Sequence, residues 1–345
     1  MYLLFYRRRG DFLVVLNKMK KFFVIVLLIL FGAGFLVFAF FFVGKPKQAE
    51  HITWGATFSH SYAEGLGLNW EETYLALLDD LKIRNFRIPL YWDELEPHKG
   101  HFVFSNWDWQ LEELEKRNGK AILAIGFKLP RWPECRMPEW AKVLSKEDRE
   151  EAILSMLKQI AEHYKDSKVV EKWQVENEYL VPFGICPEPD KNFLFKELRF
   201  VKRLDSRPVI TTDAGIASFW LTVGKHADEV GFSIYRFRVD DEGKFIKYPF
   251  PPVTYYRKAQ FFHLFHPKKE VVAMELQAEP WPVTGTIEGD YKTMSPEQFG
   301  KHIEYAKQTG FDTFYFWGAE WWYWAKEKGG DPAIWNEAKN LFEKR

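Results

Sequence analysis

Short apolar runs alternate with amphipathic segments along residues 51–345. The runs are nearly continuous, which is typical of parallel strands that are covered on both faces. There are eight of them: ITWGATF (52–58), IRNFRIPL (83–90), KAILAIGF (120–127), KVVEKWQV (168–175), PVITTDA (208–214), EVGFSIY (229–235), EVVAMEL (270–276) and FDTFYFWG (311–318). The pattern therefore predicts eight strands with helices between them.

The segments between the runs carry helix start signals. Capping residues precede helical apolar stripes at Asn69, Ser145 and Ser295. Eight strand-helix units predict an α/β fold, a (β/α)8 TIM barrel over residues 51–345. The alternative is an open doubly wound sheet, but no glycine-rich phosphate-binding loop follows the first run.

An apolar segment precedes the barrel. Residues 22–43 form an uncharged run of 22 residues, which is long enough to cross a bilayer as a helix. Six basic residues lie before this run, whereas only Lys45 and Lys47 follow it closely. The positive-inside rule therefore predicts a cytoplasmic basic segment at 1–21 and an exported body.

Whether the apolar segment is retained depends on a cleavage site. No small-residue site precedes Gly44, which favours an uncleaved transmembrane signal anchor over a cleaved signal peptide. Residues 44–50 then form a linker, and the barrel lies outside a single-pass cell membrane. Met19 with the two lysines after it resembles a natural start, which leaves open whether residues 1–18 are translated.

The composition limits the classes of partner that we expect the chain to bind. The chain carries 48 basic and 48 acidic residues, so nucleic acid is not an expected partner. Aromatic residues make up 18% of the chain and include 15 Trp. This content fits either stacking on an oligo- or polysaccharide or a dense aromatic core.

The cysteines and the potential metal ligands support few further expectations about the site. Cys135 and Cys186 fall in loops after the third and fourth strands, where a disulfide is geometrically plausible and two free thiols are the alternative. No cluster of ligand residues has a spacing that demands a metal, and we expect no cofactor.

Two carboxylates end predicted strands. Glu178 ends the fourth strand and Glu275 ends the seventh. Active sites of such barrels lie at the C-terminal ends of the strands. Retaining glycoside hydrolysis needs two carboxyl groups about 5–5.5 Å apart, one as nucleophile and one as acid and then base. We therefore expect Glu178 to be the acid/base and Glu275 the nucleophile.

Other polar and aromatic residues at this face are expected to support the pair. Arg87 and Tyr235 are expected to hold Glu275 ionised, Asn177 to bond a sugar hydroxyl, and Trp317 to form a floor under the sugar ring. Four further tryptophans are candidates, of which about half are expected to line sugar subsites and the rest to pack loops: Trp132, Trp281, Trp321 and Trp322. Weaker candidates for hydroxyl contacts are Lys128, Arg131, Glu94 and Asp213, and we interpret His51 and His60 as structural.

The chain resembles clan A glycoside hydrolases, the retaining (β/α)8 group. Asn177-Glu178 matches the acid/base motif of that group, Glu275 matches its nucleophile position, and QVENEY (174–179) is similar to β-galactosidases of family 35. The segment 91–109 resembles its counterpart in families 5 and 42. The resemblance implies the fold, the retaining mechanism, the catalytic pair and a β-linked substrate.

Glu176 is the rival to Glu178. In an ideal strand both side chains share a face, with Glu176 about 6.6 Å deeper in the barrel. We expect a β-bulge to turn Asn177 and Glu178 together towards the mouth, with Glu176 buried and hydrogen-bonded beneath them.

The sequence thus predicts a membrane-anchored, exported glycosidase that hydrolyses a β-glycosidic bond by double displacement. The alternatives are a transglycosylase that remodels surface glycans, a non-catalytic membrane-anchored carbohydrate-binding protein, and a tethered scaffold without a ligand. Segment 236–252 is expected to be either a lid or subsite wall, or a plain surface excursion.

Overall fold

The computed structural model describes the backbone of residues 2–240 and 242–343, and the side chains of this range from Met19 onwards. The chain divides into two compact units, Met1–Lys45 and Pro46–Arg345.

The first unit is the helix α1 (Tyr2–Phe42). Its segment Met19–Phe42 is long and apolar enough to cross a membrane, as the sequence predicted, and it is the one such helix among the described residues. The same property fits a signal sequence as well as a signal anchor. Most side chains of the predicted basic segment at 1–21 lie outside the described ones.

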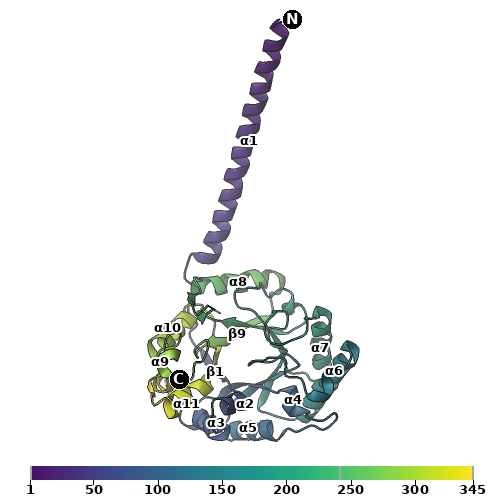
Figure 1. Cartoon of the computed structure of the whole chain (residues 1–345), viewed down its shortest axis with the longest axis vertical. Coiled ribbons are helices and arrows are strands. Elements are labelled where there is room, and N and C mark those ends of the chain that lie inside the picture. Colours follow the sequence, from purple (N-terminus) through teal and green to yellow (C-terminus); the bar gives the residue numbers. More distant parts are fainter. Residues whose placement is uncertain (1, 241, 344–345) are drawn as a thin grey trace. The chain divides into compact units, whose positions relative to one another are not determined.

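The second unit is built around a closed barrel of parallel strands (Figure 1). Its strands, in the order in which they pair around the barrel, are β1 (Thr53–Thr57), β10 (Thr313–Trp317), β9 (Glu270–Gln277), β6 (Glu229–Ile234), β5 (Val209–Asp213), β4 (Val170–Val175), β3 (Lys120–Ile125) and β2 (Asn85–Pro89). Each strand falls within or overlaps one of the predicted apolar runs. The predicted (β/α)8 barrel is therefore confirmed.

Helices surround the strands, as Figure 1 shows. They are α2 (His60–Gly65), α3 (Trp70–Asp79), α4 (Trp92–Leu95), α5 (Ser105–Glu115), α6 (Lys146–His163), α7 (Lys191–Leu204), α8 (Pro252–Phe265), α9 (Ile287–Asp290), α10 (Pro296–Lys307), α11 (Ala319–Glu327) and α12 (Ala333–Glu343), with 3-10 turns at Glu139–Ala141 and Val223–Lys225. The side chains of Asn69, Ser145 and Ser295 accept backbone N–H groups in the first turns of α3, α6 and α10. These caps confirm the predicted helix starts.

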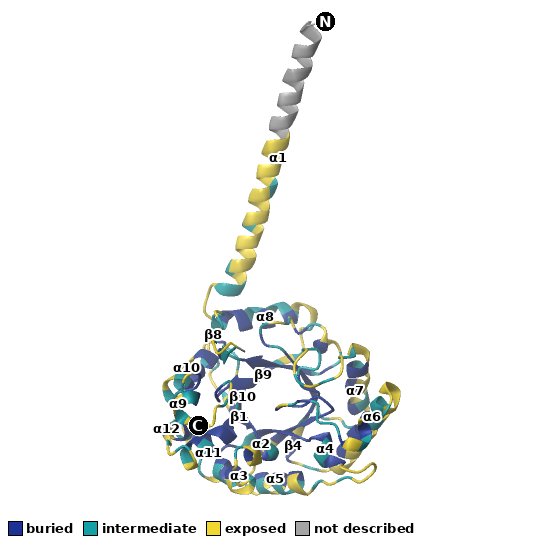
Figure 2. Cartoon of the chain, viewed as in Figure 1, coloured by how far each residue is buried: buried dark blue, intermediate teal, exposed yellow. Residues whose placement is uncertain are grey.

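The core explains much of the aromatic content. Figure 2 shows buried residues along the strands and on the inner faces of the helices. Trp321 and Trp322, which were candidates for sugar subsites, are fully buried. Their ring N–H groups donate to Asp290 Oδ2 and to the carbonyl of Ala278. These two tryptophans therefore belong to the core, and their assignment to subsites is wrong.

Segment 236–252 contains a two-stranded hairpin rather than a plain loop. Strands β7 (Phe237–Val239) and β8 (Phe245–Lys247) pair in antiparallel fashion. The side chain of Gln277, at the end of β9, accepts the N–H of Phe237 and donates to its carbonyl. The hairpin is therefore fixed to the C-terminal end of the barrel.

Candidate active site

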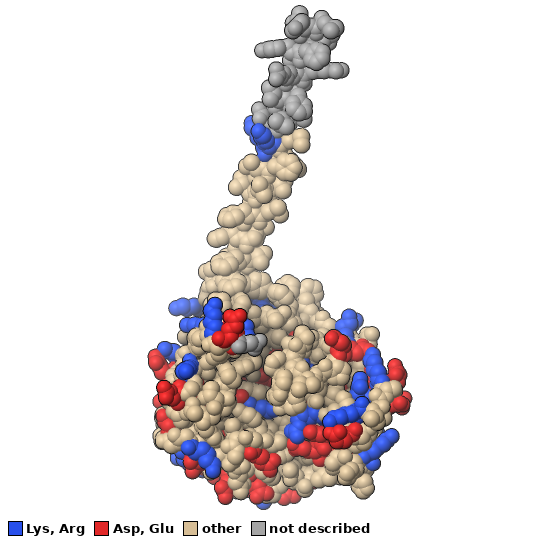
Figure 3. Space-filling model, viewed as in Figure 1, with Lys and Arg blue, Asp and Glu red and all other residues tan. Residues whose placement is uncertain are grey.

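A cavity of about 670 Å³ opens at the C-terminal ends of the barrel strands. Its lining includes the two predicted catalytic carboxylates, Glu178 and Glu275, together with residues of the loops that follow most of the strands. On the face shown in Figure 3, basic and acidic side chains are interspersed around the barrel. Because both predicted catalytic carboxylates line this cavity, it is the candidate active site.

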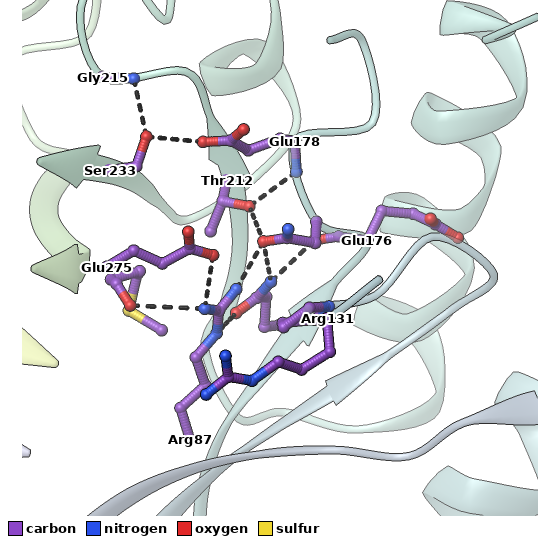
Figure 4. Close-up of polar contacts among 12 residues, drawn as sticks. Arg87, Arg131, Glu176, Glu178, Thr212, Gly215, Ser233 and Glu275 are labelled. Carbon is purple, nitrogen blue, oxygen red and sulfur yellow. Dashed lines mark hydrogen bonds and ion pairs between the residues drawn. The ribbon is translucent and has the colours of Figure 1, made fainter. Parts of the chain in front are cut away.

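Glu275 lies in β9 next to a register shift, where β9 has one residue more than the neighbouring strands, and both of its carboxylate oxygens accept hydrogen bonds. The Arg87 Nη1 donates to its Oε1 at 2.9 Å (Figure 4). The Tyr235 hydroxyl donates to its Oε2 at 2.9 Å. Arg87 is fully buried, and its other nitrogens donate to Gln174 Oε1 and Asn177 Oδ1, both at 2.6 Å. A cation and a hydroxyl donor on one carboxylate favour its ionised form.

Glu178 lies just beyond the end of β4 in a left-handed backbone conformation, with φ of 43°. The hydroxyl of Ser233, on β6, donates to its Oε1 at 2.7 Å, and the Thr212 hydroxyl accepts its backbone N–H at 2.9 Å (Figure 4). Burial and the negative charge of Glu275 together raise the pKa of Glu178 to about 7. Glu178 is thus suited to keep its proton near neutral pH.

The orientation of the Ser233 hydroxyl depends on Gly215, whose backbone lies close to that of Ser233. The N–H of Gly215 donates to the Ser233 hydroxyl oxygen at 3.1 Å (Figure 4). A Cβ atom at position 215 would lie 1.7 Å from the Ser233 carbonyl oxygen, so only glycine fits there without a shift of the backbone. The loop after β5 therefore helps to orient the hydroxyl that reaches Glu178.

Glu176 points away from the cavity. Its carboxylate accepts the N–H groups of Phe127 at 2.6 Å and of Lys128 at 2.7 Å, and the residue is fully buried. Burial raises its pKa, and burial with the charge of Glu176 raises the pKa of the adjacent, equally buried Glu197. The expectation that Glu176 is buried and hydrogen-bonded is confirmed.

The expected β-bulge is wrong. Strand β4 ends at Val175, before the three polar residues. The chain turns there because Glu176 and Glu178 have left-handed φ angles of 62° and 43°. Alternate left-handed residues, rather than an extra residue between paired strands, bring Asn177 and Glu178 towards the same side.

Besides Glu178 and Glu275, two carboxyl groups that the sequence did not point to line the cavity, those of Glu134 and Glu279. Glu134 lines the cavity, and the described partner of its side chain is Lys128 at 3.3 Å. Burial raises the pKa of Glu134 to about 8; Lys128 opposes this shift, whereas Glu275 and Glu178 add to it. Glu134 lies well beyond the end of β3, so a search of strand ends does not find it.

Arg131 and Trp317 are engaged with each other. The Arg131 guanidinium donates to Glu279 and Glu320 and lies over the rings of Tyr62, at 3.5 Å, and Trp317, at 4.1 Å. Its pKa is raised, because the two carboxylates outweigh its burial. Arg131 therefore covers part of the Trp317 ring, and both residues line the cavity.

The remaining candidates separate into two groups. Trp132 and Trp281 line the cavity, and 65% of Trp132 is exposed. The others contact protein groups: Lys128 donates to the carbonyls of Glu178 and Val181, Asp213 accepts from Ser218, Glu94 pairs with His60 and Arg136, and His51 is exposed. His60 is buried and structural, as expected.

The two cysteines are joined in a disulfide, Cys135–Cys186. The bond links the loop after β3 to the loop after β4, which are the loops of Glu134 and Glu178. Among the described residues, no group of three or more potential ligand side chains could hold a metal ion.

Comparisons with known proteins agree with the fold. No family model matches the chain, and no curated protein matches it. Xylanase 10B from Thermotoga petrophila, solved with xylobiose, is similar with a TM-score of 0.57 at 15% identity, covering 85% of this chain and 94% of that one. A β-galactosidase from Bacillus circulans sp. alkalophilus gives a TM-score of 0.52 at 12% identity, covering 79% of this chain and 50% of that one.

A third solved structure, GH5_18 from Bifidobacterium longum, gives a TM-score of 0.55 at 10% identity, covering 78% of this chain and 70% of that one. At such identities the likeness concerns the fold alone. It confirms, at that level, the predicted resemblance to the barrels of clan A glycoside hydrolases.

Proposed function

We propose that this chain is a retaining glycoside hydrolase that cleaves a β-glycosidic bond by double displacement. The observation that carries the proposal is the contrast between two carboxyl groups in one cavity. Glu275 is bound by a buried guanidinium and a hydroxyl, whereas the pKa of Glu178 is raised to about 7. One group is thereby suited to attack and the other to donate a proton.

The proposed reaction has two steps. Glu178 protonates the glycosidic oxygen while a carboxylate oxygen of Glu275 attacks the anomeric carbon, so the leaving group departs as an alcohol and a glycosyl ester forms. Glu178, now ionised, removes a proton from a water molecule that attacks the same carbon. The sugar leaves with its original anomeric configuration, and Glu178 regains its proton.

Substrate contacts follow from groups that the protein leaves available. The Oδ1 of Asn177 accepts hydrogen bonds from Arg87 at 2.6 Å and Thr212 at 2.9 Å, which orients its amide nitrogen as a donor for a sugar hydroxyl. Trp132, Trp281 and Trp317 offer aromatic surface to the apolar faces of sugar rings. The substrate class that fits this lining is an oligo- or polysaccharide.

The proposed location is the outer side of the cell membrane, with α1 as a single-pass anchor. The apolar segment Met19–Phe42 supports the anchor. The disulfide Cys135–Cys186 supports export, because disulfides persist in oxidising compartments. The boundaries proposed for these regions are 1–21, 22–43, 44–50 and 51–345.

A trapping experiment tests the proposal. A panel of aryl β-glycosides identifies the sugar, and a 2-fluoro derivative of that sugar with a good leaving group then traps the nucleophile. Fluorine slows both steps, whereas the good leaving group speeds only the first, so the glycosyl-enzyme accumulates. Peptide mapping is expected to find the label on Glu275, and proton NMR is expected to show the β-anomer as first product. Label on another residue, or the α-anomer as first product, would contradict the proposal.

A further inference from the structure

Two aromatic rings meet above the proposed catalytic pair. Phe183 lies five residues after Glu178, Trp281 lies six residues after Glu275, and their ring centroids are 6.2 Å apart in an edge-to-face arrangement. This distance is that of a direct aromatic contact. We refer to the contact as the Phe183–Trp281 bridge.

The bridge joins loops from well-separated strands. Between β4, which precedes Phe183, and β9, which precedes Trp281, the barrel order places β5 and β6. Both rings follow the strand ends and line the cavity that contains the carboxylates. Since the loops extend outward from the C-terminal ends, the bridge lies on the solvent side of the site.

The Phe183 side of the bridge is firmly held. The N–H of Ile185 donates to the carbonyl of Pro133 at 3.0 Å, and the Cys135–Cys186 disulfide joins the same two loops. The ring of Phe183 also contacts Trp132, with centroids 5.9 Å apart. A loop with these three connections is not a freely moving flap.

The Trp281 side is held as well. The backbone N–H of Trp281 donates to Thr293 Oγ1 at 3.1 Å, and the backbone carbonyl of Trp281 accepts the N–H of Val239, in the hairpin, at 3.1 Å. Its ring packs against Tyr235 at 4.8 Å, and the Tyr235 hydroxyl is the donor to Glu275. The bridge is therefore continuous with the groups that hold the proposed nucleophile.

A bridge of this kind decides how a saccharide can reach the carboxylates. An open groove accepts the middle of a chain from the side, whereas a spanned cavity accepts only a free end that enters under the span. We propose that the Phe183–Trp281 bridge restricts the enzyme to the ends of its substrate, so that it cleaves oligosaccharides from a terminus and spares interior bonds. This inference rests on the proposed function and adds the mode of attack to it.

The test compares two forms of one linear oligosaccharide, built from the sugar that the aryl β-glycosides identify. In one form both ends are free, and in the other both terminal sugars carry a bulky cyclic acetal or aryl group. The interior bonds are the same in both. The full exported chain is expected to cleave the free form at least about a hundredfold faster than the blocked form, measured by chromatography of the products.

Removing the bridge should relax this preference. Phe183→Ala is expected to raise the ratio of blocked to free cleavage by at least about tenfold. The matched control is Phe265→Ala, because Phe265 is also an exposed phenylalanine in edge contact with another ring, Phe261, and it does not line the cavity. The control is expected to leave the ratio unchanged.

The outcomes separate this inference from the function on which it rests. Rapid cleavage of the blocked form by the unaltered protein, with Glu275 still labelled by the fluorinated sugar, would overturn the bridge and leave the glycosidase intact. An unchanged ratio in Phe183→Ala would also overturn it. Absence of both turnover and label would instead overturn the proposed function, and the inference with it.

Discussion

Glu275 and Glu178 carry the same chemical group into one cavity, but the protein treats them differently. Glu275 lies within β9, and each of its carboxylate oxygens accepts a hydrogen bond, one of them from the Arg87 guanidinium. Glu178 lies past its strand in a left-handed conformation, and its carboxyl group accepts a hydrogen bond from the neutral hydroxyl of Ser233. Among the described residues, no cation is paired with it.

The difference shows how the surroundings set the protonation state. A buried cation favours a carboxylate, whereas burial without one favours the acid. The two sites also influence each other, since the charge of Glu275 raises the pKa of Glu178. The pair therefore works as one unit, and changes at either member should be felt at the other.

The largest effect is expected from Glu275→Gln. It removes the proposed nucleophile and keeps the shape, so kcat on aryl β-glycosides should fall by at least about 10⁴-fold. Glu64→Gln, at an exposed position on α2, is the control and should keep full activity. Equal circular dichroism spectra would show that both variants fold, and substantial turnover by Glu275→Gln would refute the assignment.

The loss of activity in Glu178→Gln should depend on the leaving group, whereas the loss in Glu275→Gln should not. With a poor leaving group, kcat/KM should fall by about 10²–10⁴-fold, because no acid protonates the departing oxygen. With a dinitrophenol leaving group, which needs no proton, the loss in kcat/KM should be much smaller. A loss of equal size for both leaving groups would argue against Glu178 as the acid.

Arg87→Met removes the cation that contacts Glu275 and leaves the Glu275 carboxylate itself in place. It leaves a buried acidic group without its cation, which should lower the free energy of unfolding by about 3–5 kcal/mol in urea titrations. Arg117→Met is the control, because Arg117 forms its ion pairs with Asp79 and Glu113 nearer the surface, where such pairs contribute about 1 kcal/mol or less. Similar losses for the two variants would contradict this account.

The pH profile should report the coupling between the two groups. Since Glu178 must hold a proton in the first step, kcat/KM should decline as the pH rises through about 7. Removing the charge of Glu275 in Glu275→Gln should lower the pKa of Glu178 by about 1 unit, as followed by carbon NMR of labelled glutamate. An unchanged or higher pKa would show that the two groups do not interact.

The smallest effect is expected at Ser233→Ala. The hydroxyl stabilises ionised Glu178 and so lowers its pKa. Its removal should raise that pKa and move the alkaline limb of kcat/KM to higher pH, by less than about 1 unit. A limb that moves to lower pH would show that the hydroxyl instead stabilises the protonated form.

The barrel could be predicted because its signal is local and repeated. Each strand is an apolar run of similar length, and each confirmed cap lies immediately before its helix. The positions of Glu178 and Glu275 followed from the rule that polar groups at strand ends face the mouth. That Arg87 and Tyr235 would contact Glu275 could also be expected, since Arg87 lies in β2, Tyr235 directly follows β6 and Glu275 lies near the end of β9.

The parts that escaped prediction depend on loops and on backbone angles. Glu176 and Glu178 have left-handed φ angles, and the Glu176 carboxylate accepts N–H groups of the loop after β3, a contact that no local pattern reveals. Glu134 enters the cavity from a loop whose path is set by a disulfide partner far along the chain. Trp321 and Trp322 follow a strand end, yet α11 turns them into the core.

The buried acidic groups beneath and around the cavity have a consequence for the whole molecule. Glu134, Glu176, Glu178 and Glu197 all have pKa values raised by burial, so they keep protons in the folded chain that the unfolded chain releases above about pH 4.5. Unfolding therefore releases protons, and a higher pH favours unfolding. Glu134, Glu176 and Glu178 should therefore make the protein lose resistance to heat as the pH rises from about 4.5 to about 8, above which they add no further loss.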